Sequence, residues 1–402
     1  MYTVNHLPQG WEYKKMSEVV KWGSGGTPKA TESLYYENGT IPWLIIGDLN
    51  DGIVKTSATK ITKLGLENSS AKLIPCGTLL IAMYGSIGKL GITGFDCCTN
   101  QAIAFAQKLN GIDTMYLFYY LMMIKPKLVQ LGKGGTQKNI SQTVLNSLYI
   151  PLPPLPTQQA IVTRIESLFA ELDKAVQHLR TAQQQLKTYR QAVLNHWLNN
   201  DDGKWETVKL GNIADVNTGS TPKRGNKDYW ENGNIPWITS GEANYQYITK
   251  ATEFITTKAV AETNCKIIAK GSLVIAMYGE GKTRGKCAEL SIDATTNQAL
   301  ASITFTDSRM YKNFAKWFFE KNYEDMRMLS SGGVQPNLNL GIIKNMILPL
   351  PPLTEQHRIV KEIESRLSQA TASETYIENA LQQAEALMQS ILKKAFSGEL
   401  NL

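Results

Sequence analysis

The stretch "YIPLPPLPTQQAIVTRIES" spans residues 149–167, and "ILPLPPLTEQHRIVKEIES" spans residues 347–365. Each is a proline-rich phrase that leads into a run of charged and apolar residues, and the two lie 198 positions apart. A match of this length does not arise by chance, so the chain contains a duplication. Each copy closes one long segment and opens another.

The duplication extends over the rest of the chain. "GSGGTPKATESLYYENGTIPW" from Gly23 matches "NTGSTPKRGNKDYWENGNIPW" from Asn217, and "LIAMYG" from Leu80 matches "VIAMYG" from Val274, both at a separation of 194. Solenoid repeats are much shorter, about 20 to 50 residues. We therefore expect two modules, each followed by a spacer: a module at 1–153 and its spacer at 154–203, then a module at 204–351 and its spacer at 352–402.

Each module mixes short apolar runs with Gly, Asn, Asp and Pro, and it contains one helical-looking piece. The apolar runs include "TLLIAMYG" and "SLVIAMYG", and the helical pieces are "TMYLFYYLMMIKPKLVQL" and "RMYKNFAKWFFEKNYEDMRML". Strand-like runs with turn residues between them and one longer helix predict a compact α/β module.

The spacers carry apolar residues at alternating spacings of three and four. Gln183 and Arg190 interrupt the first series, and Glu374 interrupts the second. Such a series over several heptads is typical of a coiled coil. We expect an α+β protein with two globular α/β modules alternating with two long helices that pair as an antiparallel coiled coil. The two series are Val162, Ile165, Phe169, Leu172, Val176, Leu179, Leu186 and Val193, and Val360, Ile363, Leu367, Ala370, Ile377, Leu381, Ala384, Met388, Ile391 and Ala395.

The proline phrases are predicted to be stiff joints between module and helix, because proline holds the backbone extended. Thr157 and Thr354 follow as candidate helix N-caps. The alternative is a docking motif for a proline-binding domain, which the apolar flanks disfavour.

The composition is that of a soluble globular protein, with 43% hydrophobic and 19% charged residues. The sequence contains no run of about 18 apolar residues, which a membrane span would need, and its N-terminus lacks a signal pattern. We therefore expect a cytoplasmic protein. The five cysteines form no regular framework and are expected to be buried apolar residues. The four histidines are scattered singly, so no metal site is expected.

The net charge of +7 is unevenly distributed. It is +5 in residues 1–153 and +4 in 204–351, but 0 in 154–203 and −2 in 352–402. Basic modules joined by neutral or acidic spacers fit two nucleic-acid-facing domains. A mildly basic surface without a polyanionic partner is the alternative. Antiparallel helices would place the modules at opposite ends, as two-fold symmetric proteins do when they read two half-sites of a duplex.

The paired motifs as a set resemble those of the specificity subunit of type I restriction-modification systems. They are the "TP…IPW" stretches, the "IAMYG…TNQ" stretches, the "PLPPL…Q…IV…IE" joints and the closing "QSILKKAFSGEL" from Gln389. One departure is "QAVLNHWLNN" at the end of the first spacer, where Asn195 and His196 replace the lysine pair of the closing motif. The resemblance therefore leaves open whether both spacer ends bind their partners in the same way.

The resemblance implies a non-catalytic subunit with two target-recognition domains that bind double-stranded DNA at a bipartite, asymmetric site. It implies two modification (methyltransferase) subunits as partners, together with restriction (translocase and nuclease) subunits. S-adenosylmethionine, ATP and Mg are then expected on those partners and no cofactor on this chain. The sequence contains no G-x-x-x-x-G-K-[ST] phosphate loop, no D-E-x-[DH] helicase box and no [N/D]-P-P-[Y/F] methyltransferase box, which is consistent with recognition without catalysis.

Candidate DNA contacts are polar and basic side chains near glycine-rich turns, because base edges need paired donors and acceptors and phosphates need cations. They are Lys29, Tyr84, Lys89, Lys133, Gln137, Lys138 and Asn139 in the first module, and Lys223, Arg224, Tyr278, Lys282, Arg284, Lys286, Gln335 and Asn337 in the second.

Each candidate region also has a purely structural interpretation. The glycine loops can be ordinary turns, the "TNQ" stretches at 99–101 and 296–298 can bond neighbouring backbone, and Trp43 and Trp237 are expected in the core. Residues 1–153 contain no arginine, whereas the second module has Arg224, Arg284, Arg309 and Arg327. Because arginine pairs with guanine in a bidentate way, we predict a guanine contact by the second module.

Two other functions remain open at this point. One is a coiled-coil structural adaptor whose modules bind peptides and not DNA, and the other is a self-contained methyltransferase or nuclease.

Overall fold

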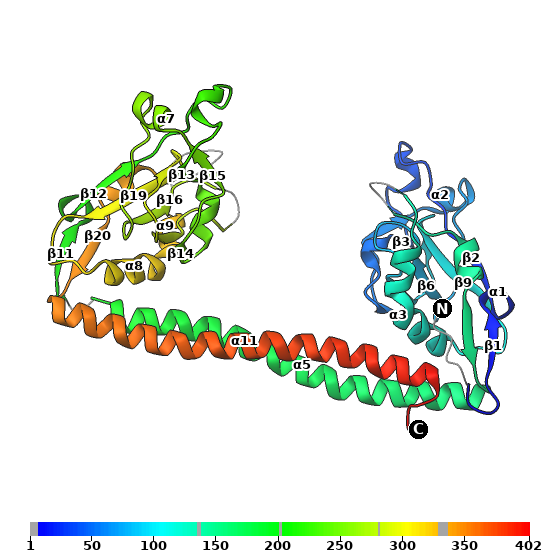
Figure 1. The fold of residues 1–402 in the computed structure, drawn as a ribbon. Coiled ribbons are helices and arrows are strands. Elements are labelled where there is room, and N and C mark those ends of the chain that lie inside the picture. The colour runs from blue at the N-terminus through cyan, green and yellow to red at the C-terminus, as the bar shows by residue number, and fades with distance from the viewer. Residues whose placement is uncertain (1–6, 135–137, 201–202, 280–281, 329–336) are drawn as a thin grey trace. The chain divides into compact units, whose positions relative to one another are not determined.

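The computed structural model describes residues 7–134, 138–200, 203–279, 282–328 and 337–402. The chain forms two units, Met1–Arg180 with Glu378–Leu402 and Thr181–Ile377. Two long helices, α5 (Leu155–Leu198) and α11 (Leu353–Ser397), each begin in one unit and end in the other. The first unit therefore consists of the first module, the start of α5 and the end of α11, and the second unit has the complementary parts (Figure 1).

The two modules share one strand order. A five-stranded sheet runs β2-β9-β6-β7-β4 in the first module and β12-β19-β16-β17-β14 in the second. A three-stranded sheet runs β5-β3-β8 and β15-β13-β18, and a two-stranded ribbon joins β1 to β10 and β11 to β20. The duplicated α/β modules predicted from the sequence are thus confirmed.

The elements of the first module, in chain order, are β1 (Glu12–Lys15), α1 (Met16–Val19), β2 (Val20–Ser24), β3 (Ile41–Leu44), β4 (Gly52–Val54), β5 (Thr59–Ile61), α2 (Lys63–Glu67), β6 (Leu79–Ala82), β7 (Leu90–Thr93), β8 (Cys98–Thr99), β9 (Ile103–Leu109), α3 (Thr114–Leu131), α4 (Gln142–Asn146) and β10 (Tyr149–Leu152). Those of the second are β11 (Glu206–Lys209), α6 (Leu210–Ile213), β12 (Ala214–Thr218), β13 (Ile235–Ile238), β14 (Tyr247–Ile248), β15 (Glu253–Ile255), α7 (Thr257–Glu262), β16 (Leu273–Ala276), β17 (Cys287–Leu290), β18 (Thr295–Thr296), β19 (Leu300–Phe305), α8 (Lys312–Lys321), α9 (Tyr323–Met328), α10 (Leu340–Lys344) and β20 (Ile347–Leu350).

The central strand β6 explains why the apolar runs are continuous and not alternating. Leu79 and Ile81 pack into the core that contains α3, whereas Leu80 and Ala82 pack into a second core on the other side of the sheet. Strand β16 divides its side chains between two cores in the same way. A strand covered on both faces needs apolar residues at every position.

The second helical piece is shorter than the sequence indicated. The first piece forms the single helix α3 with Asp113 as its N-cap, but the second breaks into α8 and α9 at Asn322. The Asn322 Nδ2 donates to the Phe318 carbonyl at 2.8 Å. Asparagine competes for backbone hydrogen bonds in this way and favours helix ends.

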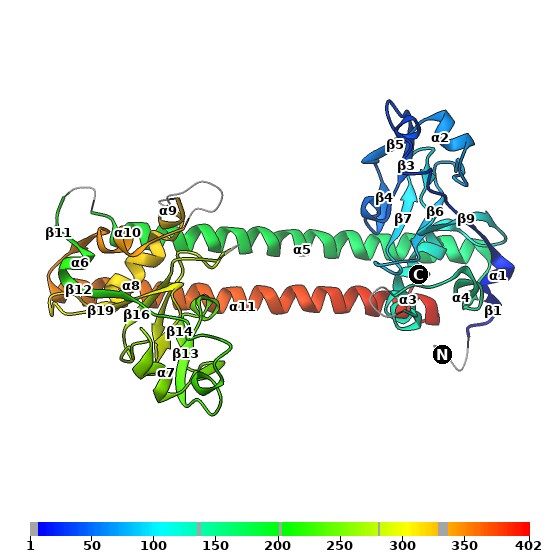
Figure 2. The same ribbon diagram turned by 90° about the horizontal axis from the view of Figure 1, so that it is seen from above.

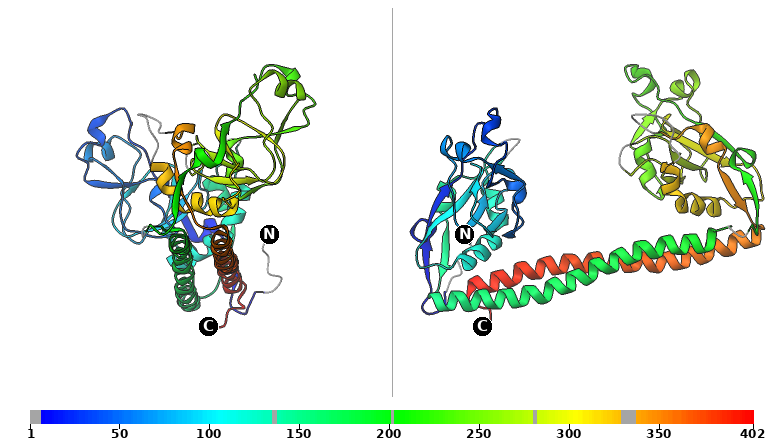
Figure 3. Two further views of the ribbon diagram at one scale, coloured as in Figure 1. Left: turned by 90° about the vertical axis from the view of Figure 1, so that its left-hand side faces the viewer. Right: turned by 180° about the vertical axis from the view of Figure 1, so that it is seen from behind.

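The long helices pair antiparallel within each unit (Figures 1 and 3). In the first unit Ile161 and Ile165 of α5 share the module core with Ile391 and Ala395 of α11. In the second unit the end of α5 and the start of α11 share a core in the same manner, through Val193, Leu194, Leu198, Ile359, Val360, Ile363 and Leu367. The predicted antiparallel helix pairing is confirmed.

Two of the three interruptions in the apolar series are partners of each other. The Arg190 guanidinium donates to both carboxylate oxygens of Glu374, at 2.9 and 2.8 Å, and to Thr371 Oγ1 at 2.6 Å. A bidentate pair of this kind favours one register of the two helices over shifted ones.

The joints between module and helix depend on a glutamine that occurs in both copies. Gln158 is fully buried; its Oε1 accepts from Asp113 N at 2.8 Å, and its Nε2 donates to the carbonyls of Gly111 and Pro153. Gln356 bonds Tyr311 N, Arg309 O and Pro351 O in the same way. This side chain links the first turn of each long helix to the turn before α3 or α8.

Both expected N-caps are wrong. Helix α5 begins at Leu155, two residues before Thr157, and α11 begins at Leu353, one residue before Thr354. Thr157 and Thr354 therefore lie inside the first turn. Pro151 and Pro349 lie in the strands β10 and β20 and are extended as expected, whereas Pro156 lies inside the first turn of α5.

Four of the five cysteines are buried, as predicted, but Cys76 is exposed and the prediction is wrong there. Cys76 lies in the turn before β6, where Asp96 accepts a hydrogen bond from its backbone N–H. Burial raises the pKa of Cys97 to about 12 and that of Cys98 to about 11. In the described part of the chain, no helix has the length and apolar character needed to cross a membrane.

Candidate nucleic-acid interface

In the first module, the "GGTP" loop is held against the "TNQ" turn. Gly26 N donates to Thr99 O at 2.9 Å, and Thr27 Oγ1 donates to Gln101 Oε1. The buried indole of Trp43 donates to Gly26 O at 2.9 Å. The core position expected for Trp43 is confirmed. The "TNQ" turn bonds the "GGTP" loop through the Thr99 carbonyl and the Gln101 side chain.

The "AMYG" loop adjoins the same turn. Met83 N donates to Ala102 O at 2.8 Å, and Met83 O accepts from Ile140 N at 2.9 Å. Tyr84 forms a β-bridge with Asn139, which in turn pairs with Lys133 through two backbone hydrogen bonds. We call this connected set of loops the first loop surface; it comprises residues 25–29, 83–89, 99–102, 132–134 and 138–140.

The second module builds the same frame. Ser220 N donates to Thr296 O at 2.9 Å, and Thr221 Oγ1 donates to Gln298 Oε1 at 2.5 Å. Met277 joins the frame as Met83 does: its N donates to Ala299 O, and its O accepts from Leu338 N. The Trp237 indole, also buried, donates to Ser220 O at 2.9 Å. This second loop surface comprises residues 219–224, 277–279, 282–286, 296–299 and 337–338.

One glycine in each frame permits a close approach of two backbones. A Cβ on Gly25 would lie 2.1 Å from Thr99 O, and one on Gly219 would lie 1.8 Å from Thr296 O. No side chain fits at these distances, so the loops meet only because these residues are glycine.

Most candidates of the first module lie on the first loop surface with exposed side chains. Tyr84, Lys133, Lys138 and Asn139 are exposed, and so is Lys29, which forms an ion pair with Glu32 at 3.0 Å. Lys89 differs, because it is half-buried and its Nζ donates to Ile46 O at 3.2 Å. Gln137 lies outside the described residues.

On the second loop surface, Lys223, Tyr278 and Lys282 are exposed, whereas Arg284 and Asn337 are half-buried. Lys286 lies 3.7 Å from Glu320 and 4.3 Å from the centre of the Tyr323 ring. Gln335 lies outside the described residues.

Arg224 has the most defined surroundings of the candidates. Its two terminal nitrogens donate to the two carboxylate oxygens of Glu253, and its guanidinium lies 3.9 Å from the centre of the Trp230 ring and 4.8 Å from that of Trp237. The hydrogen bond to Glu253 raises the pKa of Arg224. The guanidinium is thus held in one orientation before any ligand arrives.

The remaining arginines bear on the predicted guanine contact. Arg309 pairs with Asp307, and its carbonyl accepts from Gln356 at the helix joint, so it does not lie on the second loop surface. Arg327 donates to the hydroxyl of Tyr323 and is not part of that surface either. Arg224 and Arg284 remain as candidates, and the guanine contact stays a prediction.

Sequence reasoning missed the aromatic residues under the "TPK" loops. The Tyr36 hydroxyl donates to Pro28 O at 2.6 Å and its ring packs edge-on against Trp43, whereas Trp230 packs edge-on against Trp237. Aromatics at matching positions of "LYYENG" and "DYWENG" were the available signal.

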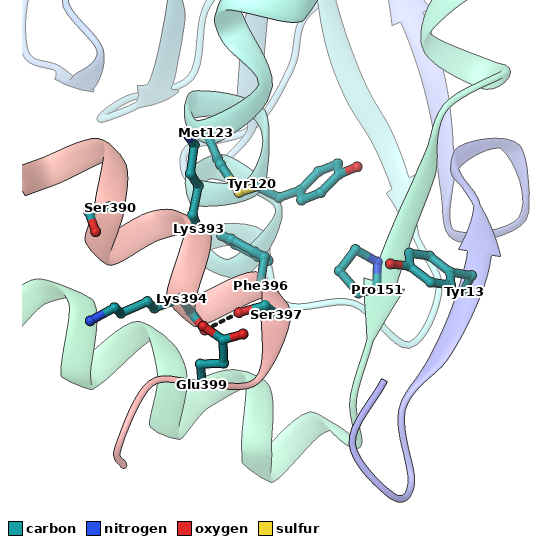
Figure 4. Close-up of a pocket in the computed structure, with 10 residues that line it drawn as sticks. All are labelled: Tyr13, Tyr120, Met123, Pro151, Ser390, Lys393, Lys394, Phe396, Ser397 and Glu399. Carbon is teal, nitrogen blue, oxygen red and sulfur yellow. Dashed lines mark hydrogen bonds between the residues drawn. The ribbon is translucent and has the colours of Figure 1, made fainter. Parts of the chain in front are cut away.

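The first unit also contains a pocket of about 330 Å³ at the end of α11 (Figure 4). Its apolar lining includes Tyr13, Tyr120 and Phe396, and Lys394 and Glu399 also line the pocket. The second unit has smaller or different residues at the matching positions, with Leu198, His196 and Thr207 in place of Phe396, Lys394 and Tyr13. The difference between the two spacer ends noted in the sequence therefore coincides with a pocket in the first unit.

The chain is similar to known proteins over nearly its whole length. The specificity subunit of the StySPI type I restriction enzyme of Salmonella potsdam is 25% identical over 98% of this chain and 90% of its own. The EcoKI specificity subunit of Escherichia coli K12 is 23% identical, with coverages of 98% and 90%.

Two solved structures show the same fold. A chain from a type I R-M system studied for its complex assembly and conformational transition has a TM-score of 0.81 at 19% identity, covering 98% of this chain and 100% of that one. The HsdS subunit of Thermoanaerobacter tengcongensis has a TM-score of 0.57 at 19% identity, with both chains 98% covered.

A family model described as "Type I restriction modification DNA specificity domain" matches residues 8–179 and again residues 202–383. The two matches follow the duplication and together cover most of the chain. The protein therefore belongs to the family of type I restriction modification DNA specificity domains.

Proposed function

We propose that the chain is the DNA-recognition subunit of a type I restriction-modification complex, and that each loop surface reads one half of a bipartite, asymmetric target. The observation that supports this proposal best is that both modules contain the same hydrogen-bonded set of loops but expose different side chains on it. Tyr84 and Tyr278 follow the same bonded methionine, and Asn139 matches Asn337. The cations differ: Lys133 and Lys138 match a serine and a proline in the second module, and Arg224 matches Ala30 of the first. A shared frame with unlike contacts suits two half-sites of unlike sequence.

The exposed groups divide by chemistry. The amide of Asn139 can present a donor and an acceptor to one base edge, as asparagine does with adenine. Lys133 and Lys138, on either side of it, supply cations for neighbouring phosphates. The expected separation of the modules stays a prediction. The number of base pairs between the two halves of the DNA target would measure it.

The test is Asn139→Ala in the complex assembled with its methyltransferase subunits. Losing one good base contact lowers affinity for the cognate site about 10- to 100-fold and relaxes specificity in one half only. Competition binding with oligonucleotides mutated in each half measures both effects. Asn337→Ala should relax the other half. As a control, Asn110→Ala removes a side-chain amide near the helix joint, where it donates to Glu18 O, and should change neither half. Equal relaxation of both halves by Asn139→Ala, or none, would refute the assignment.

The partners in this proposal are two methyltransferase subunits, which would bind S-adenosylmethionine, and restriction subunits that use ATP and Mg. The chain itself would take no part in catalysis, and it would work in the cytoplasm, where the DNA is. Support comes from the α5 apolar series, whose central members Leu172, Val176, Leu179 and Leu186 are only half-buried. Further helices from a partner could cover them and complete a bundle. Because several residues that line the pocket beside Phe396 differ at the matching positions of the second unit, we expect partner subunits to contact the two spacer ends differently.

No observation favours a coiled-coil adaptor without DNA recognition. Such an adaptor would need no glycine-dependent frame with basic side chains in both modules. Its binding to peptides would also be indifferent to competing duplex DNA.

A further inference from the structure

The second unit contains a large groove lined by residues of the C-terminal part of α5 and of the helices α8 and α9 of the second module. Figure 2 shows these three helices. The volume of the groove is about 860 Å³. We call it the basic groove, since six of its lining residues are basic and three are acidic. The six are Lys187, Arg190, Lys282, Lys286, Lys321 and Arg327.

Half of these cations are already neutralised. Arg190 pairs with Glu374, Lys286 lies 3.7 Å from Glu320, and Arg327 lies 3.8 Å from Glu324. The other three, Lys187, Lys282 and Lys321, form no ion pair with any residue that the structure describes. The groove therefore keeps an excess of positive charge available for a ligand.

The walls of the groove are tied together and to the second loop surface. Gln191 Nε2 of α5 donates to Lys321 O at 3.2 Å, and the Tyr323 hydroxyl donates to Lys282 O. Lys282 and Lys286 belong to the loop that begins at Tyr278, so the groove continues directly from the proposed base-reading residues. A ligand bound at the second loop surface would reach the groove without a gap.

The first unit has different residues at several of the matching positions. At the matching positions, 198 residues away, Glu385 stands for Lys187, Met388 for Arg190 and Met123 for Lys321. The corresponding cavity of the first unit is smaller, about 460 Å³, and its lining combines Met123, Ile124 and Pro126 with two lysines, Lys127 and Lys393. Both cavities are therefore basic, but six cations line the groove of the second unit and two line the cavity of the first.

We propose that the basic groove binds the phosphodiester backbone of the duplex beside the second half-site, without reading bases. This inference rests on the proposed function, because it needs DNA on the second loop surface. Lysine is a point charge on a flexible stem, and lysines contact phosphates with little demand on geometry. The second half-site is then held by base contacts and by a separate phosphate anchor, which has more cations than the matching cavity of the first unit.

The test is the double substitution Lys187→Gln and Lys321→Gln in the complex assembled with its methyltransferase subunits. Neither residue belongs to a loop surface. Loss of two phosphate contacts lowers the slope of log K against log salt by about 2 and weakens binding about tenfold, equally for cognate and unrelated duplexes. The methylated motif stays the same. Lys344→Gln on α10 removes one exposed charge outside the groove and should leave the slope unchanged.

The possible results separate this inference from the function on which it rests. A wild-type complex without sequence-specific DNA binding refutes the proposed function. A wild-type complex that binds specifically, with the same salt slope in the double variant, refutes only the phosphate groove. Failure of the double variant to assemble with methyltransferase subunits, while Lys344→Gln assembles, would assign the groove to an acidic segment of a protein partner and would also overturn the inference.

Discussion

Replacing Gln158 by Leu is expected to lower the free energy of unfolding of the first unit by about 3 kcal/mol. The carboxamide makes three hydrogen bonds in a fully buried position, to Asp113 N, Gly111 O and Pro153 O. Leucine has a similar volume but leaves one donor and two acceptors without their partner. Each unsatisfied buried backbone group costs about 1–3 kcal/mol, and local relaxation recovers part of this.

Urea unfolding followed by hydrogen exchange of residues 109–117 measures this change where it arises. The adjacent Gln159 is exposed on the same helical turn, so Gln159→Leu makes the same chemical change without touching the joint. We expect that variant to behave as wild type within about 0.5 kcal/mol. Equal stability of the two variants would show that the joint does not depend on the buried amide. Gln356→Leu should repeat the effect in the second unit.

Replacing Gly219 by Ala should destabilise the second module by about 3 kcal/mol and abolish reading of the second half-site. The new Cβ would lie 1.8 Å from Thr296 O and would push apart the two segments that form the frame. The carbonyl oxygen and carbon of Thr296 both belong to the backbone, so no side-chain rotation relieves the clash. Arg224, five residues further on, would lose its fixed position over Trp230.

Gly225→Ala is the matched control, because nothing lies within 4 Å of a Cβ at that position of the same loop. Thermal unfolding and competition binding of both variants decide the question. Retained half-site specificity in Gly219→Ala would mean that the frame is not what positions the reading residues. The same loss in Gly225→Ala would mean that the whole loop is sensitive to any change.

The helix pairing could be predicted from the sequence because a three-four series is a local pattern. Its register could not be predicted, since Arg190 and Glu374 each interrupt their own series and are 184 positions apart. Only the folded pair shows that one interruption satisfies the other. The break at Asn322 and the early helix starts at Leu155 and Leu353 depend on single capping and packing contacts that periodicity does not encode.

The candidate site could be predicted from the sequence about as well as the helix pairing. The duplicated loops identified the regions, and Tyr84, Lys138 and Asn139 lie exposed on the first loop surface as a ligand contact requires. The inward turn of Lys89 and the pairing of Arg224 with Glu253 depend on residues 43 and 29 positions away. Gln158 and Gln356 match in the two copies of the sequence. That they are buried and bond the turns before α3 and α8 could be seen only in the structure. Cys76 was misjudged because composition gives an average burial and not a position.

The central claim is that each module reads its own half of one target. The most direct measurement exchanges residues 1–153 for the corresponding module of a related specificity subunit, methylates random DNA with the assembled complex, and sequences the modified sites. We predict a motif of two specific halves separated by a fixed unspecific spacer. The exchange should alter one half and leave the other half and the spacer unchanged. A continuous motif, or a change in both halves, would contradict it.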